Sequence, residues 1–132
     1  MNIGELARLA GVPIDTVRYY ERQQLLPTAR RSAAGYRIFD DDAVQRLRFI
    51  RRAKALGFRL EEVGDLLMLS AERGGDMASV RQTAAARLAD IDLRMRELER
   101  MRHALAHLVD ACPGHGAMVG CPIMAALQED LE

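Results

Sequence analysis

Cysteine, tryptophan and long apolar runs are the scarcest features of this chain of 132 residues. It has two cysteines, no tryptophan, three phenylalanines and three tyrosines. So few aromatic residues predict a core of Leu, Val, Ile, Ala and Met, and the many Ala and Leu residues favour helices. The length predicts a single domain, or a small domain with an attached segment.

Two further absences concern the compartment. No apolar run reaches the roughly 18 residues of a membrane span, so we expect no membrane association. The first residues, "MNIGELARLAGVP", include an early acid and lack the apolar stretch of a signal peptide. We therefore expect a cytoplasmic protein in which Cys112 and Cys121 are thiols rather than a disulfide.

The net charge of zero conceals an uneven distribution along the chain. Residues 1–60 carry 12 Arg and Lys against 6 Asp and Glu, a balance of +6, whereas residues 61–132 carry 7 against 13, a balance of −6. A basic segment suits a polyanionic partner and an acidic one does not. The pattern favours nucleic-acid binding by the first half; an accidental division of surface charge is the alternative.

The spacing of apolar residues predicts a mainly α-helical protein. Residues 3–10 form one short helix, "GVP" interrupts it, and a second helix begins at Asp15 or Thr16. This is the pattern of a helix-turn-helix. The stretch "RRSAAGYRIFD" indicates a small β-hairpin or wing, and two further amphipathic helices follow, interrupted at Gly57.

A long helix is expected over residues 76–111, which contain neither Pro nor Gly. Its apolar positions recur every three or four residues, which is close to a heptad repeat. They are Val80, Ala84, Leu88, Ile91, Met95, Leu98, Met101 (or Arg102), Leu105 and Leu108. A helix of about 35 residues is about 50 Å long, too long to bury that stripe within so small a chain. The expected partner is a second copy, parallel or antiparallel; the alternative is a helix folded back on its own domain.

In this order the segments resemble the MerR family of transcriptional regulators, in its metal-sensing branch. The resemblance rests on "TVRYYE" (16–21), on "GYR" (35–37) before an aromatic residue, and on Gly57 before "FRLEE", and it covers essentially the whole chain. The pattern C-P-G…C-P-I is most similar to the copper-efflux regulators. The mercury regulators share the pattern of two cysteines separated by eight residues, and they are the next most similar group.

The resemblance implies a winged helix-turn-helix DNA-binding domain (1–70), a dimerisation helix that forms an antiparallel coiled coil (76–111), and a metal-binding loop with a short C-terminal helix (112–132). It implies a homodimer that binds double-stranded promoter DNA, distorts it when metal arrives, and so activates transcription by RNA polymerase. The controlled genes would serve metal efflux or detoxification. The expected DNA contacts are Thr16, Arg18, Tyr20, Arg31, Tyr36, Arg37, Arg52 and Lys54.

The two cysteines enclose a glycine-rich loop, "CPGHGAMVGCP" (112–122). Two thiolates on one short loop suit a soft ion that accepts two ligands in a line, such as Cu(I), Ag(I) or Au(I), whereas Zn(II) prefers four ligands. We expect one Cu(I) per loop, bound by Cys112 and Cys121. Hg(II) also accepts two thiolates in a line, and His115 is a candidate weak third ligand.

In the family, the first residue of the dimerisation helix lies near the partner's metal loop and resembles a Cys in sensors of divalent ions and a Ser in sensors of monovalent ions. The matching residue here is Met77, which is neither. We expect Met77 to be an apolar lid over the site or a weak thioether ligand. His103 and His107, one turn apart on the same helix, are expected to be exposed.

Other classes of function fit less well. The sequence shows no Ser/His/Asp pattern, phosphate loop or paired carboxylates, so we expect no enzyme activity. A thiol-redox sensor in the same fold, with Cys112 and Cys121 joining as a disulfide, is the main alternative besides a mercury sensor.

Overall fold

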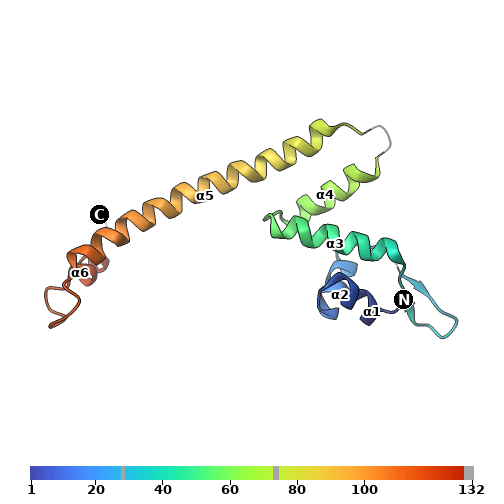
Figure 1. Ribbon diagram of the computed structural model, residues 1–132, viewed down its shortest axis with the longest axis horizontal. Coiled ribbons are helices and arrows are strands. Elements are labelled where there is room, and N and C mark those ends of the chain that lie inside the picture. The colour runs from blue at the N-terminus through green and yellow to red at the C-terminus, as the bar shows by residue number, and fades with distance from the viewer. Residues whose placement is uncertain (28, 73–74, 130–132) are drawn as a thin grey trace. The chain divides into compact units, whose positions relative to one another are not determined.

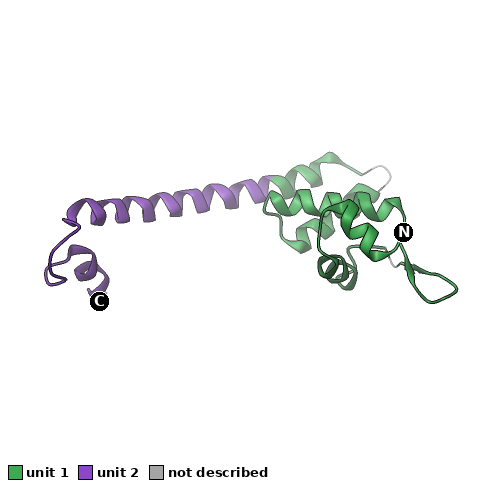
Figure 2. Ribbon diagram, turned by 60° about the horizontal axis from the view of Figure 1, so that its bottom comes forward, with its two compact units in different colours: residues 1–84 green, residues 85–132 purple. Residues whose placement is uncertain are grey.

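The computed structural model describes residues 1–27, 29–72 and 75–129. In those ranges the order of elements is α1 (Ile3–Ala10), α2 (Ile14–Arg22), β1 (Arg30–Arg31), β2 (Arg37–Ile38), α3 (Asp41–Ala55), α4 (Leu60–Ala71), α5 (Met77–Ala111) and α6 (Pro122–Gln128) (Figure 1). The chain forms two compact units, Met1–Ala84 and Ala85–Glu132 (Figure 2). The expected mainly helical fold with a helix-turn-helix and wing is confirmed.

The helix-turn-helix is defined by its caps. The Asn2 side chain accepts a hydrogen bond from the backbone N–H of Glu5 at 2.8 Å and so caps the start of α1. Gly11 ends α1 with a φ of 72°, a left-handed conformation that a residue with a Cβ adopts only at a cost. Helix α2 begins at Ile14, slightly before the expected start, because Pro13 occupies the cap position and needs no N–H there.

The wing is a two-stranded antiparallel hairpin in which Arg30 pairs with Ile38 and Arg31 with Arg37. Its turn is closed by a hydrogen bond from the Ser32 N–H to the Tyr36 carbonyl at 2.7 Å. With two residues in each strand, the hairpin has little stability of its own and depends on its surroundings.

Helices α3 and α4 complete the first unit. The Asp40 side chain accepts a hydrogen bond from the Ala43 N–H at 3.2 Å and caps α3, and the Glu62 carboxylate accepts one from the Arg59 N–H at 2.8 Å at the start of α4. Apolar side chains from α1 to α4 and their connections form one core: Leu6, Ala7, Ala10, Val17, Leu25, Leu26, Phe39, Ala43, Val44, Leu47, Ile50, Ala53, Phe58, Val63, Leu66 and Leu67.

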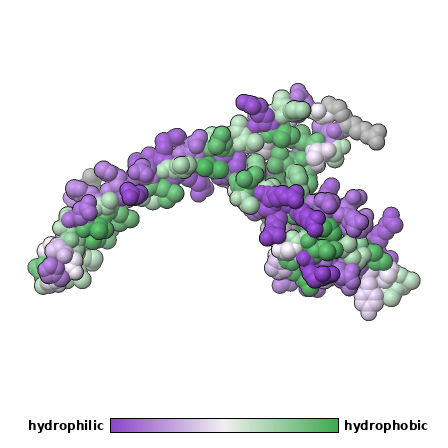
Figure 3. All heavy atoms as spheres, in the orientation of Figure 1, coloured by the Kyte–Doolittle hydropathy of each residue, from purple (hydrophilic) through white to green (hydrophobic). Residues whose placement is uncertain are grey.

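Helix α5 has a different character. Its 35 residues give it a length of about 52 Å. Its apolar stripe is largely exposed, including Leu88, Met95, Leu98, Met101 and Leu105. Figure 3 shows hydrophobic residues gathered along one edge of the C-terminal part of α5 and hydrophilic residues along the other. No helix among the described residues is both long and apolar enough to cross a membrane.

Candidate functional site

Two groups of side chains make up the candidate site. The first, called the basic face, consists of basic and aromatic side chains on α2, the wing and α3 of the first unit. The second is the cysteine loop, residues 112–122, of the second unit. On the basic face, α2 presents Arg18, whose guanidinium lies 3.7 Å from the Asp15 carboxylate. Both side chains are more than half exposed, so this ion pair adds little stability and leaves Arg18 able to bind another anion. Thr16, in the first turn of α2, is half-buried.

The two adjacent tyrosines of α2 have different environments. Tyr20 packs against the core, and burial, with the neighbouring Tyr19 adding to it, raises the pKa of Tyr20 above its usual value. Tyr19 is exposed, and the two rings lie 5.9 Å apart at a tilt of 50°. Tyr20, which was expected to contact DNA, is thus partly taken into the core, and Tyr19 presents the more accessible ring.

The wing carries the next group. Tyr36 lies at the turn with 74% of its surface exposed, and its N–H donates to the Ser32 hydroxyl oxygen at 3.1 Å. The Arg31 guanidinium donates to the Gly35 carbonyl at 3.0 Å, which stiffens the turn. An exposed aromatic ring on the same hairpin as two arginines, Arg31 and Arg37, is suited to contact with a phosphate backbone.

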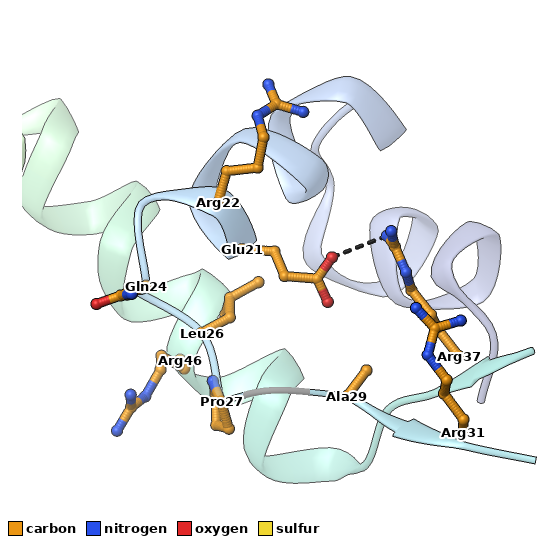
Figure 4. A pocket seen from close by; sticks show the side chains of 9 residues that line it. All are labelled: Glu21, Arg22, Gln24, Leu26, Pro27, Ala29, Arg31, Arg37 and Arg46. Atoms are coloured by element: carbon orange, nitrogen blue, oxygen red, sulfur yellow. Dashed lines mark ion pairs between the residues drawn. The ribbon is translucent and has the colours of Figure 1, made fainter.

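A cleft of about 610 Å³ lies between the end of α2, the wing and α3 (Figure 4). Four of its lining residues are arginines: Arg22, Arg31, Arg37 and Arg46. Arg31 and Arg37 were expected from the sequence, whereas Arg22, Arg46 and the one acid of this lining, Glu21, were not. Glu21 and Arg22 directly follow the tyrosines of "TVRYYE", but nothing in their spacing shows that the wing folds over them.

The last part of the basic face is α3. Arg48 and Arg51 donate to the carbonyls of Leu9 and Ala10 at 3.3 and 3.4 Å, and so satisfy the C-terminal end of α1. Arg52 and Lys54 are exposed in the last turn of α3. They therefore remain the α3 cations best placed for an external anion.

The cysteine loop begins where α5 ends. The Cys112 N–H donates to the Leu108 carbonyl at 3.1 Å, continuing the helix pattern, and the Cys121 N–H donates to the Met118 carbonyl at 3.0 Å. Between them the backbone curls back through Gly114 and Gly120, whose φ values are 82° and 89°. Both cysteines are half-buried and neither is in a disulfide.

The pKa of the Cys121 thiol lies below its ordinary value. The main cause is the backbone N–H of Met124, which interacts with the sulfur; burial acts in the opposite direction, and the N–H of Ile123 and the Cys112 thiol lower the pKa further. The thiolate form of Cys121 is therefore favoured relative to that of an ordinary thiol. This donor set fits a soft ion with two thiolate ligands.

Two further residues, His115 and Met77, were expected to contribute to a metal site. The His115 Nδ1 lies 3.1 Å from the Pro113 carbonyl oxygen, so this nitrogen already has a hydrogen-bond partner within the loop. Met77 is the first residue of α5 and is 86% exposed. Because Cys112 follows the last residue of a helix about 52 Å long, Met77 cannot reach the loop of its own chain. Among the described residues, no cluster of three or more His, Cys, Asp or Glu side chains is arranged to hold a metal ion.

Comparison with known protein families gives two matches. Residues 1–69 match the model of the MerR helix-turn-helix family of regulatory proteins, and residues 44–108 match the model described as MerR, DNA binding. Together these matches extend from α1 into the last turns of α5.

Individual relatives match over nearly the whole length. The HTH-type transcriptional regulator HmrR of Rhizobium leguminosarum is 40% identical over 129 residues, which cover 98% of each chain. The lead(II) complex of the regulator PbrR691 from Ralstonia metallidurans is similar with a TM-score of 0.87 and 34% identity, covering 96% of this chain and 98% of that one. The mercury(II) complex of MerR from Bacillus megaterium has a TM-score of 0.74 and 32% identity, covering 98% and 100%.

Proposed function

The chain belongs to the MerR family of metal-responsive transcriptional regulators, and on that premise we propose that it binds promoter DNA as a homodimer and activates metal efflux or detoxification genes in response to Cu(I), or to Ag(I) or Au(I). The observation that supports the metal assignment is the presence of two free thiols, Cys112 and Cys121, at the two ends of one loop between α5 and α6. The family is one of regulators rather than enzymes.

DNA binding is assigned to the basic face. We propose Thr16, Arg18, Tyr20, Arg31, Tyr36, Arg37, Arg52 and Lys54 as the contacts, with domain boundaries at 1–70, 76–111 and 112–132. The balance of +6 over residues 1–60 supports a polyanionic partner. Basic residues on the wing and at the end of α3 suit phosphates, which position the protein, and we propose that Arg18, in the middle of α2, reads a base edge.

A dimer explains the exposed stripe of α5. Leu88, Leu98 and Leu105 are each about 60% exposed, an arrangement that is costly in water unless a second apolar surface covers it. A second α5 offers the same stripe at the same spacing. RNA polymerase at the promoter is the further partner that activation requires.

The loop residues would hold the ion as follows. When bound, the ion supplies a positive centre to which both sulfurs bond. Cys121 enters as a stabilised thiolate because of the Met124 and Ile123 N–H groups, and Cys112 is its neighbour. We propose that bound metal would hold the two ends of the loop together, dock α6 on α5, and so shift the DNA-binding units of the dimer. Met77 acts as a lid over the loop of the partner subunit.

The test is an anaerobic titration of the reduced dimer with Cu(I), Hg(II) and Zn(II) against competing chelators, with X-ray absorption to count ligands. We expect one tight Cu(I) per loop with two sulfur neighbours. Cys112→Ser and Cys121→Ser should abolish tight binding and metal-dependent activation but preserve DNA binding. Met118→Leu, which removes an exposed thioether from the same loop, is the matched control and should change neither.

A divalent ion is the second candidate, because the similar structures hold lead(II) and mercury(II). Preference for a divalent ion with three or more ligands would overturn the Cu(I) assignment and give His115 or Met77 a ligand role. Activation by peroxide in the absence of metal, lost in either cysteine variant, would instead favour a thiol-redox sensor.

A further inference from the structure

Glu21 is the one acid among the arginines of the basic cleft. It is the second-last residue of α2, and its carboxylate lies 2.8 Å from the Arg37 guanidinium of the wing (Figure 4). This is the shortest ion pair of those found among the described residues; the others are 3.7 Å long. The Glu21 side chain is only 19% exposed, and that of Arg37 is 40% exposed.

The wing needs such a partner because of its own sequence. Arg31 and Arg37 are direct cross-strand neighbours, and both side chains line the same cleft. Like charges directly opposite each other destabilise a pair of strands, and this hairpin has only two residues in each strand. A carboxylate beside one of the two guanidinium groups offsets their repulsion.

A carboxylate such as that of Glu21 is unexpected on a surface that is proposed to bind DNA. A carboxylate on a surface that binds a polyanion repels it. The half-buried position and short distance give Glu21 a different role: it joins the last turn of α2 to the second strand of the wing, two elements that lie 15 residues apart along the chain.

We infer that Glu21 is a positioning residue for DNA binding: it holds the Arg37 guanidinium and fixes the wing to α2, so that both elements meet the duplex as one rigid surface. This inference rests on the proposed DNA-binding function. Arg37 keeps further N–H groups for a phosphate while one of its nitrogens is held by Glu21, because a guanidinium has five donors.

The experiment compares Glu21→Gln with Glu61→Gln in the full-length dimer. Glu61 is an exposed acid in the first turn of α4, so the control makes the same change of charge away from the wing. The probe is a fluorescein-labelled duplex of mixed sequence, titrated over a range of salt concentrations, because wing contacts to phosphates do not depend on sequence.

We expect Glu21→Gln to weaken binding about 5- to 10-fold at low salt and to reduce the slope of log K against log[salt] by about one, the signature of a lost phosphate contact. Glu61→Gln should leave both quantities close to those of the parent. In an Arg37→Gln background, Glu21→Gln should cause no further loss, since the two side chains act as one unit.

Tighter binding by Glu21→Gln, with an unchanged or steeper salt slope, would overturn the inference, because the acid would then be merely repulsive. Failure of the parent itself to bind any duplex would instead overturn the proposed function. A DNA-free readout separates the two: the NMR signal of the Arg37 Nε–H and the amide signals of residues 30–38 should shift in Glu21→Gln and not in Glu61→Gln. Unchanged wing signals would contradict the positioning role whatever the DNA result.

Discussion

The two compact units of this chain place their apolar residues in opposite environments. Every buried apolar side chain of the described residues belongs to Met1–Ala84, where four helices and a hairpin enclose them. In Ala85–Glu132 the large apolar side chains are mostly exposed, with Leu98 62% and Val119 94% exposed. The charge also differs along the chain: the first 60 residues are net basic and the remaining residues are net acidic.

This difference separates folding from assembly. The first unit obtains its hydrophobic stabilisation within one chain, because short helices at varied angles bury one another's faces. The second unit is mostly one long helix, whose described apolar side chains are mostly exposed and so call for a partner. Four predictions test this contrast, from the largest expected effect to the smallest.

A substitution at Leu47 should have the largest effect on the stability of the first unit. It is 1% exposed in the middle of α3, so Leu47→Ala leaves a cavity and should lower the free energy of unfolding by about 3 kcal/mol. Urea denaturation followed by circular dichroism measures this change. Leu56→Ala, at an exposed position just after α3, should cost less than about 0.5 kcal/mol. Equal losses at both positions would contradict the assignment of the core.

Leu98 tests whether the second unit depends on a partner. Leu98→Glu places a charge in the exposed stripe of α5 and should weaken dimerisation about 100-fold, as measured by sedimentation over a range of concentrations. Arg100→Glu introduces the same side chain two residues further, on nearly the opposite side of the helix, and should leave the dimer intact. A dimer that survives Leu98→Glu would mean that another surface joins the subunits.

A smaller effect is expected at the cap of α3. Asp40→Ala removes the acceptor for the Ala43 N–H and should lower the stability of the first unit by about 1 kcal/mol. Asp40→Asn keeps an acceptor oxygen and should lose only a fraction of that. Thermal unfolding monitored by circular dichroism compares the two variants, and a loss of the same size in both would point to the charge rather than the cap.

The mildest test uses the pH dependence of thiol reactivity. Because the Met124 N–H lowers the pKa of Cys121, its thiolate persists as the pH falls below the ordinary thiol pKa. Alkylation of the metal-free Cys112→Ser protein by iodoacetamide should therefore reach half its maximal rate at a lower pH when folded than when unfolded in urea. Identical profiles in the two states would show that α6 does not stabilise the thiolate.

The local pattern of the chain determined much of this architecture. Gly11 and Pro13 between two short amphipathic helices predicted the helix-turn-helix, and the uninterrupted run of residues 76–111 predicted α5, found at Met77–Ala111. These are signals of backbone preference and periodicity, which depend on neighbours within a few residues. The spacing of the two cysteines predicted a loop between them, which lies between α5 and α6; their role as metal ligands stays a prediction.

Tertiary structure decided what no local pattern carries. The assignment of Tyr20 to the core, the burial of Ala7 rather than Leu9 on α1, and the ion pair of Glu21 with Arg37 all arise where segments distant in sequence meet. The packing of the elements decides which face of a helix is buried and which arginine forms an ion pair. Packing in turn depends on contacts across the whole chain. The residues that bear charge were visible in the sequence; which of them act together was decided by the fold.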